Sequence, residues 1–244
     1  MAKKSTALVK WDEKLAAKAK AQAAVEVLGN GNRFSIQGGK LSFKKVNIPE
    51  NKINVIIVDS IFENALYEGT YNPASPDIPI CFAYGDDEKT IVPHEKSRKM
   101  QNKAGCATCP HNEWASAKTG KGKACKNNRK LILLPADSDD IESAELGVLS
   151  VPPTSLKAWK GYVHQLNNTL NRPAMSVVTE ISVAIENTYP VLGFRLVEKL
   201  EDGDVLEAIE KREEEARKIL TQPYTPIERT EVKTKKQLKA RKFV

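Results

Sequence analysis

The sequence has no long apolar run. Its apolar runs, such as residues 55–58 and 131–134, are far short of the roughly 20 residues that a membrane-spanning helix needs. Residues 1–10 contain three lysines, but no apolar segment follows them, as it would in a secretory signal. We therefore expect a soluble, cytoplasmic protein that has no membrane as a partner.

Patterns that are typical of hydrolytic enzymes are also missing. Asp59 and the acidic stretches 86–88 and 137–142 are the nuclease candidates, but they lack paired carboxylates with a supporting lysine. Residues 120–125 read Gly-Lys-Gly-Lys-Ala-Cys and are not a P-loop, because Ala124 stands where that motif has serine or threonine. We expect a protein that is not an enzyme, and a nuclease is the weakest alternative.

The chain is basic and long enough to fold around a core. Its 244 residues are 41% apolar, which allows one elaborated domain or one domain with a small appended module. Its net charge of +7 favours polyanionic partners, since counterions released from a polyanion make the association favourable. A basic protein without such a partner is the alternative, so the charge carries weight mainly where it clusters.

Hydrophobic periodicity predicts an α+β, β-rich protein. Strands are expected where apolar and polar residues alternate or β-branched residues gather, namely at residues 34–43, 53–58, 80–84, 131–134, 148–151 and 177–196. Amphipathic helices are expected at 156–170, with Trp159 on the core side, and at 205–220. The predicted organisation is a helical N-terminal arm, a main domain, a C-terminal helix and a basic flexible tail, at residues 1–31, 32–200, 201–220 and 221–244.

The four cysteines have a spacing typical of metal sites. Cys106 and Cys109 form a C-x2-C pair, Cys125 follows after fifteen residues, and Cys81 precedes the pair by 24. A C-x2-C turn places two sulfurs about 2.3 Å from one Zn²⁺ ion, which completes its tetrahedron with two more ligands. Disulfides are not expected, because cytosolic thiols are kept reduced.

A structural Zn²⁺ ion is therefore the predicted cofactor, with four ordinary buried cysteines as the alternative. Residues 94–130, which we call the basic module, are too polar to form their own core, and metal binding can supply about 10 kcal/mol of folding free energy. Cys81 is the least certain ligand, since His94 or His111 could replace it. An iron-sulfur cluster would use the same thiolates and stays open.

The basic module carries ten lysines and arginines but only two acidic residues, Glu95 and Glu113. A four-thiolate zinc site contributes a net charge of minus two, so the module remains strongly positive. Trp114 lies within it among polar neighbours, and bases of single strands stack on such aromatic faces. The candidate nucleic-acid contacts are Lys44, Tyr67, Tyr71, Tyr84, Arg98, Lys99, Lys103, Trp114, Lys121, Lys123, Lys126, Arg129 and Lys130.

Three stretches together resemble a family of tailed-phage proteins. They are Pro-Ile-Cys-Phe-Ala at 79–83, Cys-Ala-Thr-Cys-Pro-His-Asn-Glu-Trp at 106–114, and Gly-Lys-Gly-Lys-Ala-Cys-Lys-Asn-Asn-Arg at 120–129. The chain is similar there to the phage single-stranded DNA-binding proteins of replication and recombination. The likeness runs from about residue 40 to 134 and more weakly to 197.

The resemblance implies an OB-like β-barrel with the four cysteines at one metal site beside the strand-binding face. It implies a non-catalytic binder of single-stranded DNA, acting without regard to sequence in the cytoplasm of a phage's host. RNA, replication proteins as further partners, and the oligomeric state stay open. The basic residues at 229–242 depart from the acidic tail that such proteins often carry. The main alternative is a zinc-containing adaptor or regulator that binds a host or phage polymerase.

Overall fold

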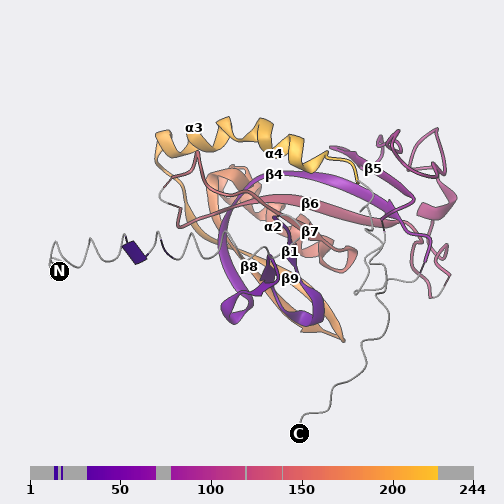
Figure 1. Cartoon of the computed structure of the whole chain (residues 1–244), viewed down its shortest axis with the longest axis horizontal. Helices are drawn as coiled ribbons and strands as arrows, with labels where there is room; N and C mark the ends of the chain where they lie inside the picture. Colours follow the sequence, from indigo (N-terminus) through magenta and orange to yellow (C-terminus); the bar gives the residue numbers. More distant parts are fainter. Residues whose placement is uncertain are drawn as a thin grey trace, which may run out of the picture.

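The computed structural model describes residues 14–15, 18, 32–69, 78–118, 120–138 and 140–224, and an antiparallel sheet runs through its middle (Figure 1). Six strands form this main sheet: β4 (Lys52–Leu66), β5 (Cys81–Gly85), β6 (Lys126–Pro135), β7 (Gly147–Val151), β8 (Val177–Glu186) and β9 (Tyr189–Lys199). Their order is β7-β6-β4-β8-β9, and β5 pairs with β4 beside this path. The predicted α+β, β-rich class is confirmed.

A small second sheet packs against the main one. It consists of β1 (Phe34–Ser35), β2 (Ser42–Phe43) and β3 (Val46–Asn47). Arg33 bridges to Val148 of β7, while the short helix η1 (Gln37–Gly39) contacts β8 and β9. None of the described strands joins β7 to β9 directly, so the main sheet is open and the closed OB-like barrel is not shown.

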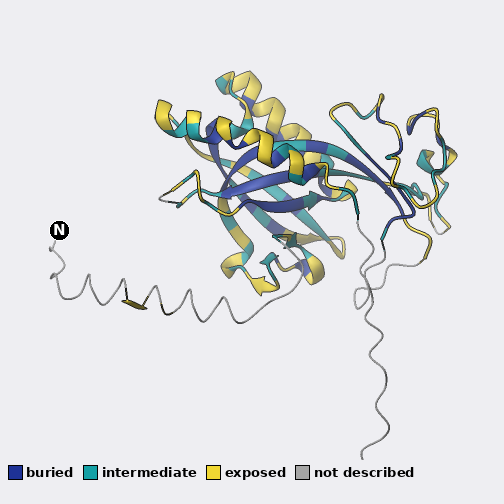
Figure 2. Cartoon of the chain, turned by 45° about the horizontal axis from the view of Figure 1, so that its top comes forward, coloured by how far each residue is buried: buried dark blue, intermediate teal, exposed yellow. Residues whose placement is uncertain are grey.

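Helix α2 (Leu156–Leu170) covers one face of the main sheet. Its apolar stripe places Trp159, Tyr162 and Leu166 in a cluster with alternate residues of β4 such as Ile57, as the alternation of side chains along a strand requires. The expected position of Trp159 in the core is confirmed. Figure 2 shows the strands buried between exposed helices.

The opposite face is covered by two short helices in place of the single one expected at 205–220. Helices α3 (Gly203–Lys211) and α4 (Glu213–Leu220) meet at Arg212 and follow one another along the sheet (Figure 1). The Arg212 guanidinium donates to the backbone oxygens of Ile141, Glu142 and Ala144. These three bonds hold the junction in place. The spacing of apolar residues along the sequence does not predict them.

Strand β4 organises the rest of the molecule. Along one edge it pairs with β6 from Val55 to Ala65, and the register shifts between Ile57 and Asp59, which leaves Val58 as a bulge. Along the other edge it pairs with β8 at residues 52–56 and with β5 at residues 62–66. Among the described strands, none pairs with residues 57–61 on that second edge.

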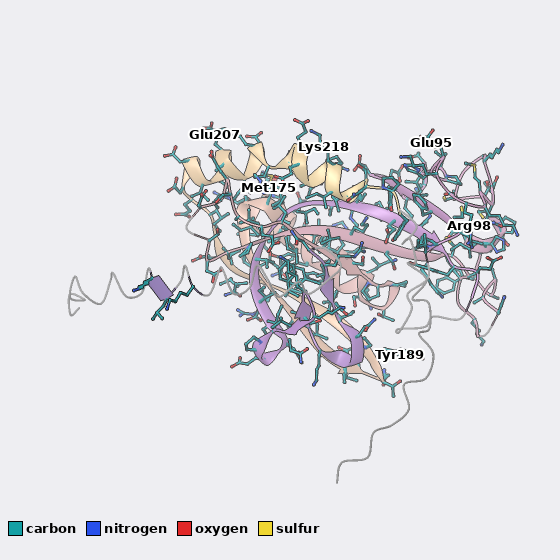
Figure 3. All side chains as sticks on the ribbon, in the orientation of Figure 1. Glu95, Arg98, Met175, Tyr189, Glu207 and Lys218 are labelled. Carbon is teal, nitrogen blue, oxygen red and sulfur yellow. The ribbon has the colours of Figure 1, made fainter. Side chains whose placement is uncertain are left out.

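The basic module leaves the sheet after β5 and rejoins it at β6, at one end of the molecule (Figures 1 and 3). Strand β6 already begins at Lys126, so the last five residues of the module are strand residues. Most of the predicted N-terminal arm and most of the tail lie outside the described residues. The tail is described only at residues 221–224, of which 223 and 224 are partly buried. None of the described helices is both long and apolar enough to cross a membrane.

Candidate metal and nucleic-acid site

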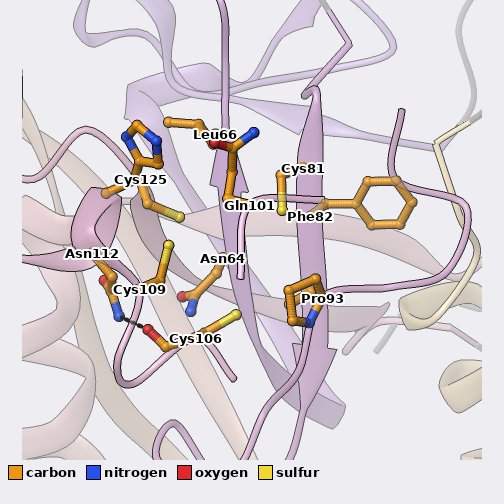
Figure 4. Close-up of a pocket in the computed structure, with 12 residues that line it drawn as sticks. Asn64, Leu66, Cys81, Phe82, Pro93, Gln101, Cys106, Cys109, Asn112 and Cys125 are labelled. Carbon is orange, nitrogen blue, oxygen red and sulfur yellow. Dashed lines mark hydrogen bonds between the residues drawn. The ribbon is translucent and has the colours of Figure 1, made fainter. Parts of the chain in front are cut away.

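The four cysteines line one cavity of about 20 Å³, little more than the space that one water molecule needs. Cys81 begins β5, Cys106 and Cys109 lie in the loop of the basic module, and Cys125 directly precedes β6. Figure 4 shows them surrounding the side chain of Asn64, which comes from β4. The structure therefore brings together all four residues that were predicted to act as ligands.

Backbone hydrogen bonds fix the loop that carries these thiols. The N–H of Cys109 donates to the oxygen of Cys106 at 3.3 Å, which closes the C-x2-C turn, and the N–H of Cys106 donates to Ile91 at 3.0 Å. The N–H of Cys125 donates to the oxygen of His111 at 2.8 Å. A loop with few apolar residues is thus held by polar contacts around its sulfurs.

All four cysteines are free thiols, and two have raised pKa values. Burial raises the pKa of Cys106, and the neighbouring thiols Cys81 and Cys109 add to this effect. Burial and the neighbouring thiols of Cys106, Cys81 and Cys109 raise the pKa of Cys125 to about 12. Without a cation Cys106 and Cys125 therefore keep their protons at physiological pH, whereas metal ligation requires thiolates and releases those protons.

Asn64 has an amide group with a free donor at this cavity. Its Oδ1 accepts a hydrogen bond from Asn127 Nδ2 at 2.6 Å, while its buried Nδ2 has no hydrogen-bond partner among the described residues. The amide favours the thiolate form of Cys106 and so opposes the increase in its pKa. A donor beside a sulfur is typical of the outer shell of a metal site, where it stabilises a charged ligand.

The cysteine side chains are not spaced as the ligands of one ion. Among the described residues, no three His, Cys, Asp or Glu side chains are placed, as they stand, to hold one metal ion. His111 also lines the cavity, whereas the ring of His94 stacks on Phe82 with its centroid 5.0 Å away. Of the two histidines considered as a replacement for Cys81, only His111 is thus near the sulfurs.

Trp114 is the most exposed large apolar side chain of the module, with 77% of its surface accessible. Lys123 Nζ lies 5.7 Å from the centre of its ring and donates to Asn112 Oδ1 at 3.2 Å. The candidate contacts Arg98, Lys99, Lys103, Lys121 and Lys126 are also exposed. Arg98 forms a solvent-exposed ion pair with Glu68 at 2.9 Å.

Two candidate contacts, Tyr84 and Lys130, are covered by the chain itself. Lys130 is 3% exposed, lies 3.7 Å from Glu63 and donates to the backbone oxygen of Leu220 at 2.9 Å. Its ammonium group lies over the ring of Tyr84, and Tyr224 stacks on that ring with centroids 6.3 Å apart. In this arrangement Lys130 is enclosed, while Tyr84 is partly exposed but has Lys130 and Tyr224 against its ring.

The remaining candidates lie apart from this cluster or outside the description. Lys44 is in the turn between β2 and β3 and forms an ion pair with Glu145. Tyr67 follows β4 and is 37% exposed, while Tyr71 lies outside the described residues. Arg129 is partly buried, with its guanidinium 4.2 Å above the ring of Phe62.

Tyr224 is a site residue that sequence reasoning missed. It was assigned to the flexible tail, but its hydroxyl donates to Glu63 at 2.7 Å and its ring packs edge-on against Phe82. Burial raises its pKa, and the nearby Glu63 carboxylate adds to the increase. The available signal was an aromatic residue four positions after the amphipathic helix expected at 205–220.

Comparisons with protein-family models, with curated proteins and with solved structures found no match to this chain.

Proposed function

We propose that this chain is a non-catalytic, sequence-independent single-stranded DNA-binding protein of phage replication or recombination, with a structural zinc site. The observation that carries the proposal is the exposure of Trp114 within a surface of solvent-facing lysines and arginines. A large aromatic face in a polar environment is costly to expose unless a partner covers it, and stacked bases fit such a face.

Charge supports the same partner. Two of the ten cationic residues of the module are taken up by the fold: Lys130 is enclosed, and Arg129 is held over the ring of Phe62. The other eight are not. Lysine and arginine side chains along a surface bind phosphates without reading base sequence. RNA would offer the same phosphates and bases, so its binding is one arm of the test.

Zinc completes the proposal because the module needs a rigid frame. The support for zinc is the common cavity of the four cysteines, the absence of a disulfide between them and the unpartnered donor of Asn64 among the described residues. Cys81, Cys106, Cys109 and Cys125 would hold the ion, with its role structural. The OB-like assignment also belongs to this proposal, with the small sheet filling the space between β7 and β9.

Binding is tested by titrating fluorescent oligo(dT), oligo(U) and a DNA duplex at two salt concentrations. We expect single strands to bind more tightly than duplex, with log affinity falling by about 0.7 per neutralised phosphate for each tenfold rise in salt. Elemental analysis should find one zinc per chain. Salt-independent binding, or tighter binding of duplex, would contradict the proposal.

Trp114→Ala isolates the stacking contribution. A stacked base contributes about 1–3 kcal/mol, so we expect affinity for oligo(dT) to fall by a factor of about 5 to 150. Tyr189→Ala is the matched control, since Tyr189 is 61% exposed at the β8–β9 hairpin and lies away from Arg98 of the module (Figure 3). Equal affinities for the two variants would exclude Trp114 as a stacking surface.

A further inference from the structure

The unpaired stretch of β4 opens into a second cavity, which we call the notch. It is bounded by residues 57–60 of β4, Arg129 of β6, one side of α2, the short helix η5 (Ala174–Ser176) with the preceding Pro173, and Glu213 at the start of α4. The notch forms because β8 pairs with β4 only up to Ile56 and β5 begins to pair only at Phe62. Its volume of about 410 Å³ is within the range of roughly 300–1,000 Å³ typical of small-molecule sites.

The walls of the notch have two kinds of chemistry. Ile57, Val163 and Met175 give it an apolar wall, and Val163 is 40% exposed although it lies on the core-facing half of α2. Lys160 and His164 on α2 are exposed and face the same space as Arg129. An apolar wall beside convergent cationic groups suits a ligand with one flat apolar part and one anionic part.

Arg129 retains hydrogen-bonding capacity at this site. One terminal nitrogen donates to Ser60, at 2.8 Å to the hydroxyl and 3.2 Å to the backbone oxygen. Its buried Nε has no acceptor among the described residues, and the central carbon of the guanidinium lies 4.2 Å from the centre of the Phe62 ring. Such a fixed guanidinium binds the paired oxygens of a phosphate well.

The acidic groups at the notch, Asp59 and Glu213, offset part of this charge, and Asp59 acts on Arg129 directly. Asp59 is held by Arg217, whose Nε lies 2.9 Å from Oδ2 and whose terminal nitrogen donates to Oδ1 at 3.1 Å. Glu213 is exposed, as is Lys160, and Glu88 makes only a long contact of 3.9 Å with Lys160. The cationic side of the notch is therefore accessible to an anion.

We infer that the notch binds one nucleotide, with its phosphate at Arg129, Lys160 and His164 and its base against Val163 and Met175. The inference extends the proposed function, because the nucleotide is then one unit of the bound single strand. Strand β6 connects the two regions: Arg129 lies on the same face of the strand as Asn127, which donates to Asn64 at the cysteine cavity, and the two residues are about 7 Å apart along the strand. A free nucleotide has the same chemistry and is the other possible source.

Lys160→Gln tests the phosphate contact, with Lys157→Gln as a matched control on the same helix. Both lysines are exposed on α2, but only Lys160 lines the notch. Loss of one phosphate contact removes about 0.7 from the salt slope, which corresponds to about fivefold weaker oligo(dT) binding at 0.1 M salt. We expect this loss for Lys160→Gln and a clearly smaller one for Lys157→Gln.

Val163→Trp fills the notch without changing its charge, and the exposed Gln165→Trp is its control on the same helix. We expect only Val163→Trp to weaken oligo(dT) binding. Equal affinities within both pairs of variants would overturn the inference. If Trp114→Ala still weakened binding in that case, the proposed function would stand without the notch.

Thymidine monophosphate distinguishes the two sources of the nucleotide. Calorimetry measures its binding to the wild-type chain and to the two tryptophan variants. Binding that is lost in Val163→Trp but kept in Gln165→Trp supports the notch as a nucleotide site. If the wild-type chain binds thymidine monophosphate in this way but does not bind oligo(dT), the notch takes a free nucleotide and the proposed function fails. If neither ligand depends on Lys160 or Val163, the notch is not a nucleotide site.

Discussion

At the scale of single residues, Asn64 has the most specific role that the fold assigns. It lies on the face of β4 opposite to Glu63, between the cysteines and Asn127, and its Oδ1 is already used by Asn127. Burying an amide donor without an acceptor costs about 1–3 kcal/mol, so its position needs a compensating partner. A metal-bound thiolate at Cys106 would be that partner.

Asn64→Leu is therefore expected to weaken zinc binding by about 10- to 100-fold, as the loss of an outer-shell hydrogen bond typically does. Competition with a chromophoric chelator measures this affinity. Asn128→Leu is the control, because Asn128 is a neighbouring asparagine on β6 that faces Glu63 instead. Zinc affinities equal to wild type in both variants would show that Asn64 does not support a metal ligand.

At the scale of elements, the segment after α4 acts as part of the fold. Tyr224 contributes a ring to the cluster with Phe82 and Tyr84 and a hydroxyl to Glu63, which shares its carboxylate with Lys130. Burial lowers the pKa of Lys130, and the adjacent Glu63 opposes this effect. The buried ion pair therefore depends on Tyr224 to shield and complete it.

Tyr224→Ala is expected to lower the free energy of unfolding by about 2 kcal/mol, less than for a fully buried aromatic residue because Tyr224 is partly exposed. Urea denaturation followed by circular dichroism measures the change. Gln222→Ala, an exposed change in the same segment, should leave stability within about 0.5 kcal/mol of wild type. Equal stability of both variants would mean that the segment does not hold the ion pair in solution.

Most elements were predictable, because they follow from periods in the sequence. The alternation at 177–196 predicted β8 and β9, and the stripe at 156–170 predicted α2 with its bounds. The break at Arg212 and the notch beside Ile57 were not predictable. Both depend on which distant segment a backbone group meets, and the local pattern of apolar residues does not contain that information.

At the scale of the whole molecule, the thiols link stability to pH in opposite ways with and without metal. A thiol whose pKa is raised in the fold, as that of Cys125 is to about 12, binds its proton more tightly in the folded chain than in the unfolded one. The metal-free chain therefore loses stability as pH rises above about 9 toward that value. Ligation of the proposed zinc ion would reverse the sign, because protons would then compete with the ion for thiolates.

We expect the stability difference between zinc-loaded and chelator-treated protein to be large at pH 8 and to shrink as the pH falls. Urea denaturation with and without chelator over a pH series measures this difference. Carboxylates far from the cysteines contribute equally to the stability of both samples, so their contribution cancels. Addition of zinc to the chelated sample is the control and should restore stability. A difference near zero at every pH would contradict a structural zinc site.

The candidate site was predictable in part. The spacing of Cys106, Cys109 and Cys125 located the turn and its polar loop, and the polarity around Trp114 indicated its exposure. The enclosure of Tyr84 and Lys130 was hidden, because it depends on a residue 94 positions after Lys130. Charge and aromatic character identify groups that can bind a strand, but only packing decides which of them are accessible.

The position of the module's insertion also bears on how such a chain can be altered. Gly85 pairs with Phe62 and Lys126 pairs with Ala65, on opposite edges of β4, so the two attachment points are roughly 14 Å apart by strand spacing and rise. About five extended residues would close that gap. Residues 86–125 thus form an insertion that recombination or protein engineering could exchange, whereas Cys81 and Asn64 of the cysteine cavity belong to the sheet and would remain with it.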